Sequence, residues 1–182
     1  MEREKEGPGL ARQNGIRLIG PNCLGVIDTS PPLNPSASAW TPPSSPMAFL
    51  SQSGVLGADT LDWAQARGPG LNKFVSLGNK TDVSEIDLLE AWGEAAWSRV
   101  IRCSIEGVPD GQAFIEVTRR TSKKKSIVAI ESDATQGGAR SVSSHTGSLA
   151  GSEQAHQATF RQAGIVRANT LEDLFDHVIG FA

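Results

Sequence analysis

The chain has 182 residues, of which 38% are hydrophobic and 20% charged, and its formal net charge is −3. These values are typical of a globular protein with room for one sizeable α/β domain, or for a domain and a fragment of another. The slightly acidic balance argues against a nucleic-acid partner. The basic run at 123–125 precedes an apolar stretch, so we interpret it as a solvated turn.

Cellular location and metal binding can be addressed from the same composition. No apolar stretch approaches the roughly 18–20 residues that a membrane span needs, and residues 1–15 contain no apolar signal-peptide core. Cys23 and Cys103 lie far apart, without the spacing of a zinc site or of a disulfide framework. We therefore expect a cytoplasmic protein with no metal site and no membrane partner.

The first 46 residues predict little regular structure. Residues 1–15 are polar and are expected to be helical or frayed, and 16–20 (IRLIG) predicts a short strand. Residues 31–46 hold six of the ten prolines. Because proline fixes φ and removes a backbone donor, we interpret this stretch as an extended connector, with Trp40 pinning it to a surface.

From residue 47 onward, short apolar runs alternate with segments of helical length. The apolar runs are 47–51, 72–78, 99–105, 126–132 and 165–168. Near-continuous apolar strands that alternate with helices indicate a parallel sheet covered on both faces. The predicted fold is therefore α/β: a flavodoxin-like, doubly wound, parallel five-stranded sheet.

Two of the intervening helices carry local signals. The helix predicted at 54–66 is followed by a Gly-Pro-Gly stop. Ser84 opens the next helix, with Asp87 three residues later as in a capping box. Trp92 and Trp97 lie on or near the apolar side of this helix, so both are expected in the core.

Ligands of doubly wound sheets bind at the carboxyl ends of the strands, so the loops that follow the strands predict the site. Ser51, Ser53 and Gly54 follow the first strand and lead directly into a helix. Free N–H groups, hydroxyls and the helix dipole there could cradle an anion, although serine and glycine are also ordinary turn and cap residues. Glu106 ends the third strand; it is either solvated or able to orient a facing histidine.

A long glycine-rich segment, SDATQGGARSVSSHTGSLAG, follows the fourth strand and contains His145 near its end. Loops of this length in a compact domain are usually functional or disordered. No second histidine or cysteine at ligand spacing supports a metal, and no serine-elbow pattern supports a hydrolase triad. A phosphoryl-accepting histidine remains, beside the alternative that His145 is an ordinary loop residue.

Five stretches together carry a resemblance to a known family. They are GIRLIGPNCLGVI, FLSQSGVLG, VSLGNKTDVSEIDLLE, IEGVPDG and ARSVSSHTGSLAG with FRQAGIVRANTLEDLFD after it. From residue 11 on, their order and spacing resemble the NDP-forming acyl-CoA synthetases, which include ADP-forming acetyl-CoA synthetases and are related to the succinyl-CoA synthetase alpha subunit. The resemblance implies a reversible reaction in which acyl-CoA and phosphate give acyl phosphate and CoA. The acyl phosphate then phosphorylates a histidine, and the phosphohistidine makes ATP from ADP.

The resemblance also assigns roles to residues. His145 would be the transiently phosphorylated histidine, and Glu106 the glutamate that orients it. The phosphate-binding residues would be Ser51, Ser53, Gly54 and Gly147. Glu131 and Ala134 stand where the family commonly has basic residues, so we expect weaker attraction for anions there.

By the same resemblance, residues 1–30 would be the C-terminal remnant of a CoA-binding Rossmann domain. Residues 31–46 would be a Pro/Ser-rich linker, and 47–182 the flavodoxin-like domain. CoA and Mg-ATP/ADP would be substrates handled by a CoA-binding domain and an ATP-grasp domain or subunit outside this sequence. The chain alone would bind no cofactor tightly, and we expect an oligomer.

Two other functions are considered. One is a non-catalytic module that senses acyl-CoA or nucleotide within a larger protein, such as an acetyltransferase fusion. The other is a flavodoxin-like FMN binder, which the low aromatic content of 5% and the absence of tyrosine disfavour.

Overall fold

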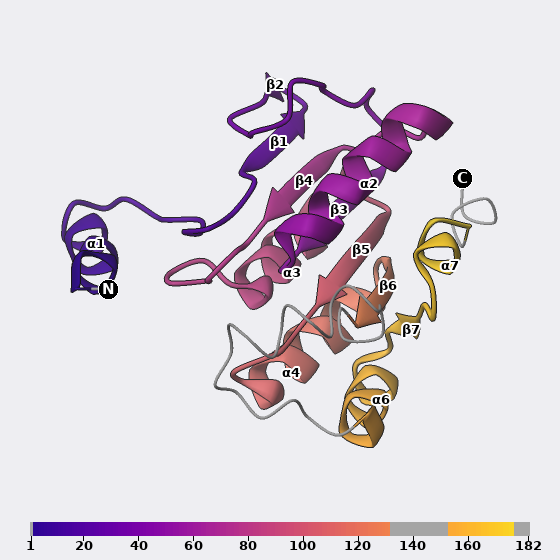
Figure 1. The fold of residues 1–182 in the computed structure, drawn as a ribbon. Helices are drawn as coiled ribbons and strands as arrows, with labels where there is room; N and C mark the ends of the chain where they lie inside the picture. The colour runs from indigo at the N-terminus through magenta and orange to yellow at the C-terminus, as the bar shows by residue number, and fades with distance from the viewer. Residues whose placement is uncertain (1, 132–152, 177–182) are drawn as a thin grey trace.

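The computed structural model describes residues 2–131 and 153–176, without the side chains of 2–6, 153–156 and 176. The described strands are β1 (Val26–Thr29), β2 (Pro32–Leu33), β3 (Met47–Ser51), β4 (Lys73–Ser76), β5 (Val100–Ile105), β6 (Ser126–Glu131) and β7 (Val166–Arg167). The described helices are α1 (Glu2–Gln13), α2 (Gly54–Arg67), α3 (Glu85–Glu94), α4 (Gly111–Ser122), α6 (Glu153–Ala163) and α7 (Leu171–Asp176). Together they form one sheet with helices on both faces (Figure 1).

The sheet confirms the predicted fold. Its described strands follow the order β2-β1-β4-β3-β5-β6-β7, and β3 to β7 are all parallel. Counted from β3, the parallel strands have the spatial order second, first, third, fourth, fifth, which is that of flavodoxin-like sheets. All five residues of β3 are buried, as expected for a central strand covered on both faces.

Two antiparallel strands extend this sheet beyond the five predicted ones. β1 pairs with β4, with Ile27 opposite Phe74, and β2 pairs with β1. β2 lies inside the proline-rich stretch 31–46, where Pro32 is tolerated because β2 is the outer strand and needs no further donor. Trp40 packs against the sheet, as expected for a residue that pins the connector. The boundaries at residues 30 and 46 stay a prediction, although strand pairing joins the segments on either side of them.

The strand predicted at 16–20 is wrong. Leu18 N–H donates to the Asp82 carboxylate (2.8 Å), and Leu18 C=O accepts from Val83 N–H (3.1 Å). This segment therefore runs along the loop before α3, where a side-chain carboxylate provides the partner that a neighbouring strand would otherwise supply.

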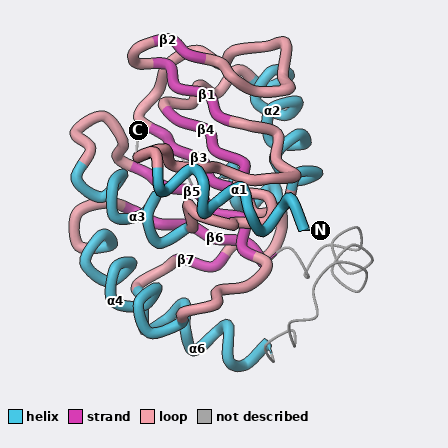
Figure 2. Tube along the Cα trace, turned by 90° about the vertical axis from the view of Figure 1, so that its left-hand side faces the viewer, coloured by secondary structure: helices cyan, strands magenta, loops and turns pink. Residues whose placement is uncertain are grey.

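Two apolar layers hold the helices on the sheet. The first contains Leu88, Leu89 and Trp92 of α3, Phe114 of α4 and Phe160 of α6, and the second Leu61 of α2 and Leu174 of α7. Figures 1 and 2 show α3, α4 and α6 on one face and α2 on the other. None of the described helices has the length and apolarity to cross a bilayer.

The α3 signals are confirmed in part. Asp87 accepts hydrogen bonds from the N–H and the hydroxyl of Ser84, which is the predicted helix start. Trp92 is buried as expected, but Trp97 is 67% exposed, so its assignment to the core is wrong. The helix ends at Glu94, and the 3.6-residue period no longer governs where Trp97 points.

Candidate functional site

The carboxyl ends of β4, β3 and β5 form the edge at which a ligand is expected. Ser51 is in register with Ser76 on one side and Ser104 on the other, and all three side chains are fully buried. The loops that leave β3, β4 and β5 therefore emerge side by side. Ser53, Gly54 and Glu106, predicted as site residues, all lie in these loops.

The start of α2 provides an open helix N-terminus. Ser53 Oγ accepts from Leu56 N–H (3.3 Å), which makes Ser53 the N-cap. A Cβ added at Gly54 would meet nothing within 4 Å, and Val55 is 70% exposed. An anion can therefore approach the first turn of α2, where free N–H groups and the positive end of the dipole favour it.

The two serines of this turn differ in what they can still donate. The Ser51 hydroxyl donates to Ser53 C=O (2.6 Å), so its hydrogen is committed to shaping the turn. The Ser53 hydroxyl acts as an acceptor in the cap, and among the described residues it donates to no partner. Ser53 is accordingly the better direct donor to an anion, while Ser51 supports the site through the shape of the turn.

Glu106 stands in a turn that neighbouring side chains fix in place. Gln52 Oε1 accepts from the N–H of Glu106 (2.7 Å) and from that of Gly107 (3.0 Å). Lys80 Nζ donates to Gly107 C=O (2.8 Å). Glu106 is half-buried. Gln52 and Lys80 were not predicted as site residues, and the only sequence signal for Gln52 was its position between Ser51 and Ser53.

The lysine that binds the Glu106 turn also belongs to a buried ion pair. Lys80 Nζ is 3.2 Å from an oxygen of Glu85, whose side chain is fully buried. Burial, with a smaller contribution from the Glu85 charge, raises the pKa of the Cys103 thiol far above its ordinary value. Cys103 is therefore held as a neutral thiol and is a poor nucleophile.

Glu131, at the end of β6, forms an ion pair with Arg167 of β7 (3.1 Å). Its negative charge is thereby compensated by a partner on the adjacent strand. His145, Gly147 and Ala134 lie outside the described residues, so their predicted roles remain predictions.

The geometry of this edge can be compared with that of known proteins. The sequence profile of the family described as succinyl-CoA ligase like flavodoxin domain matches residues 44–180. The chain belongs to this family. Its flavodoxin-like strand order agrees with the description of the family domain.

Several relatives are ligases named for their ADP-forming reaction. The chain is 42% identical over 176 residues to the ADP-forming acetate–CoA ligase I of Archaeoglobus fulgidus, covering 97% of this chain and 26% of that protein. It is 42% identical over 166 residues to the alpha subunit of the ADP-forming acetate–CoA ligase I of Pyrococcus furiosus, covering 91% of this chain and 36% of the subunit.

A solved structure supports the same relationship. The dinucleotide forming acetyl-coenzyme A synthetase 1 of Candidatus Korarchaeum cryptofilum, solved with phosphate and ADP, matches with a TM-score of 0.88 and 37% identity. The match covers 96% of this chain and 38% of that one. The chain thus spans between about a quarter and two fifths of the length of these relatives.

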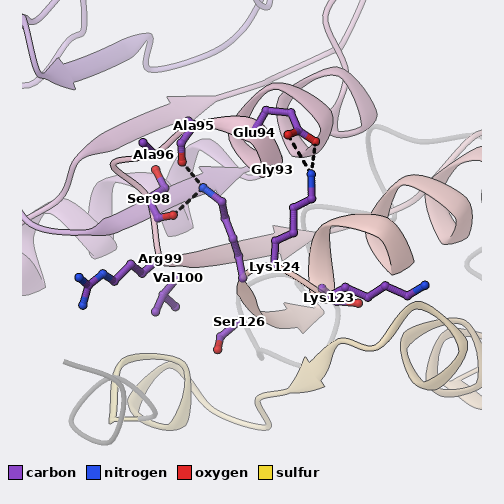
Figure 3. A pocket seen from close by; sticks show the side chains of 12 residues that line it. Gly93, Glu94, Ala95, Ala96, Ser98, Arg99, Val100, Lys123, Lys124 and Ser126 are labelled. Atoms are coloured by element: carbon purple, nitrogen blue, oxygen red, sulfur yellow. Dashed lines mark hydrogen bonds and ion pairs between the residues drawn. The ribbon is translucent and has the colours of Figure 1, made fainter.

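The basic run at 123–125 lies at the opposite, amino-terminal edge of the sheet. It lines a groove of about 650 Å³ between the end of α3 and the start of β6 (Figure 3). Lys124 forms an ion pair with Glu94 (2.6 Å), and Lys125 Nζ donates to the C=O groups of Ala95 and Ser98. Burial lowers the pKa of Lys125. Lys124 thus binds the last residue of α3 and Lys125 the segment that follows it, which is a structural role.

Residues 2–131 and 153–176 contain no cluster of three or more His, Cys, Asp or Glu placed to hold an ion.

Proposed function

We propose that this chain is the phosphohistidine-bearing part of an NDP-forming acyl-CoA synthetase, in which His145 carries the phosphoryl group. Family membership and the names of the relatives, which are ADP-forming acetate–CoA ligases, support the reaction class. The observation that carries the proposal is the open first turn of α2, joined through Gln52 to the fixed turn of Glu106. An anion site and a carboxylate are the two features that a phosphohistidine needs.

The proposed transfer begins with an acyl phosphate. A neutral ring nitrogen of His145 attacks phosphorus, so that a P–N bond forms while the P–O bond to the acyl group breaks. The carboxylate product leaves with the electron pair. Since an imidazole titrates with a pKa near 6.5, a substantial neutral fraction is available at pH 7.

Glu106 would accept a hydrogen bond from the second ring nitrogen of His145. This bond would fix the tautomer and orientation of the ring and compensate the positive charge that develops on attack. The first turn of α2, with Ser53 and Gly54, would stabilise the negative oxygens of the phosphoryl group. Gly147 would let the histidine segment approach closely.

The complete reaction would require further domains or subunits, and the greater length of the relatives leaves room for such domains. We propose that CoA, acyl-CoA and Mg-ATP/ADP are substrates bound largely by a CoA-binding domain and by an ATP-grasp domain or subunit. The assembly would be oligomeric and cytoplasmic.

Phosphoryl labelling tests the proposal. The chain is incubated with phosphorus-labelled ATP, magnesium and its ATP-grasp partner, and the protein-bound label is tested for stability in acid and base. We expect a label that is lost in acid and kept in base, as for phosphohistidine. His145→Asn should abolish it, and His156→Asn, the matched histidine control, should retain it.

Two results would contradict the proposal. Label that survives in His145→Asn would show that another residue carries the phosphate. Absence of label in the unaltered chain would favour the non-catalytic sensor module.

A further inference from the structure

We propose that Gln52 is a positioning residue for Glu106: its side-chain oxygen fixes the turn that aims the carboxylate. This inference rests on the proposed role of Glu106 in orienting the phosphorylated histidine. Gln52 was not among the site residues predicted from the sequence.

Gln52 extends the β3–β5 ladder by one residue past the end of β3. Its own N–H donates to Ser104 C=O (3.1 Å), two residues before Glu106. Its side chain then reaches the turn itself, where Oε1 accepts the N–H groups of both Glu106 (2.7 Å) and Gly107 (3.0 Å). Three hydrogen bonds from one residue therefore determine the path of the chain at the end of β5.

The orientation of the Gln52 amide follows from these partners. Two converging N–H donors can be satisfied only by an oxygen, so Oε1 must face the turn. Gln52 is 5% exposed, and its Nε2 has no hydrogen-bond partner among the described residues. The side chain is thus held through its oxygen alone, and removing that oxygen leaves two backbone N–H groups to find new acceptors.

Lys80 fixes the same turn from its carbonyl side. Lys80 Nζ donates to Gly107 C=O (2.8 Å) and is paired with the buried Glu85 (3.2 Å). The N–H groups of the turn are therefore held by the loop after β3, and its carbonyl by the loop after β4. Such a double attachment pre-organises a carboxylate that must meet its partner in a narrow range of geometry.

The position of Gln52 also couples the two parts of the candidate site. It directly precedes Ser53, the N-cap of α2, and it holds the turn of Glu106. A change in the Gln52 side chain is therefore expected to move the carboxylate relative to the anion-binding turn.

The test compares two substitutions of similar size in the full chain. Gln52→Met keeps the length of the side chain and removes the acceptor, whereas Gln52→Glu keeps an oxygen at Oε1. The probe is labelled acetyl phosphate, and the measured quantity is the rate of phosphohistidine formation. We expect Gln52→Met to label roughly 10- to 100-fold more slowly than the unaltered chain. Gln52→Glu should keep most of the normal rate.

A second readout separates positioning from a general structural effect. In a Glu106→Gln background, Gln52→Met should have little further effect, because both changes remove one interaction.

The outcomes are distinguishable. If the unaltered chain takes no label, the proposed function fails and the inference with it. If it is labelled but Gln52→Met reacts at the normal rate, or slows labelling equally in the Glu106→Gln background, only the inference is overturned. Circular dichroism checks folding, and if Gln52→Met does not fold, Gln52→Asn provides a shorter side chain that cannot reach the turn.

Discussion

Asp82 joins the N-terminal segment to the loop before α3. Its carboxylate accepts from Leu18 N–H (2.8 Å) and from Arg17 Nε (2.9 Å), and it also contacts Arg12 (3.2 Å). The hydrogen bond from Leu18 N–H, followed by that from Arg17, lowers the pKa of Asp82. A carboxylate with a lowered folded-state pKa stabilises the fold above its unfolded value of about 3.9, and the stabilisation is lost as the pH falls through the folded-state pKa.

We therefore predict that Asp82→Asn lowers the thermal midpoint by a few degrees at pH 7 and that the difference from the unaltered chain shrinks below about pH 4. Thermal unfolding followed by circular dichroism at several pH values measures this. Asp59→Asn, on the exposed side of α2, is the matched control and should change the midpoint little. A difference that stays constant down to pH 2 would contradict the assignment.

The individual residues of the site were predictable to different degrees. Ser53 and Glu106 could be placed from the sequence because they end apolar strands, and strand ends define the binding edge. Gln52 could not, since its importance depends on which backbone groups of a distant loop come within reach. The pairing of Glu131 with Arg167 could not be predicted either, because the two residues become adjacent only when β6 and β7 pair.

Among the elements, α7 is attached to the sheet by an unusual set of contacts. The Phe175 ring stacks on Trp63 of α2 with 4.0 Å between centroids, and also lies beside Phe49 (6.5 Å). The fully buried Arg102 of β5 donates to Phe175 C=O (2.7 Å), and its guanidinium lies 5.2 Å from the ring centroid. A cation at the C-terminal end of a helix is favourable, so both the ring and the carbonyl of Phe175 anchor α7.

Phe175→Ala should lower the free energy of unfolding by about 3–5 kcal/mol, because it empties a buried aromatic site and removes the stack on Trp63. Phe175→Leu keeps most of the apolar volume and should cost less than about 1.5 kcal/mol. Urea unfolding followed by tryptophan fluorescence and by circular dichroism measures both. Equal effects of the two substitutions would contradict this expectation, because they would mean that the apolar volume kept by leucine contributes little.

Elements were predicted well where a local signal governs them and poorly where tertiary contacts do. Ser84 and Asp87 were sufficient to place the start of α3, because the capping box forms within one turn. The segment 16–20 has the composition of a strand, but its hydrogen-bond partners lie in a loop 60 residues or more away. β1 was not predicted, because four residues are too few to show the two-residue period of a strand.

At the scale of the whole molecule, the N-terminal segment and the flavodoxin-like sheet form one packed unit. Residues 18–25 bond along the loop that follows β4: Thr81 N–H donates to Gly20 C=O (3.1 Å), and Asn79 N–H to Pro21 C=O (2.9 Å). A Cβ at Gly78, whose φ is +57°, would lie 2.2 Å from Pro21 oxygen, so only glycine permits this approach. These contacts favour a folding unit that begins before residue 44, where the family match starts.

Two truncations test where this unit begins. A chain that starts at residue 16 loses α1 and the ion pair that the exposed Arg12 forms with Asp82, but it keeps Arg17 and Leu18 as partners of Asp82, so its urea midpoint should change little. A chain that starts at residue 44 loses β1, including Ile27, which is fully buried, and leaves β4 as an open edge. Burial of one such side chain alone is worth about 1.5–3 kcal/mol, and an unpaired edge promotes association between chains. We therefore expect a lower urea midpoint and concentration-dependent aggregation, measured by circular dichroism and light scattering. If the shorter chain instead unfolds at the same midpoint and stays monodisperse, the division at residue 46 describes the folding unit correctly.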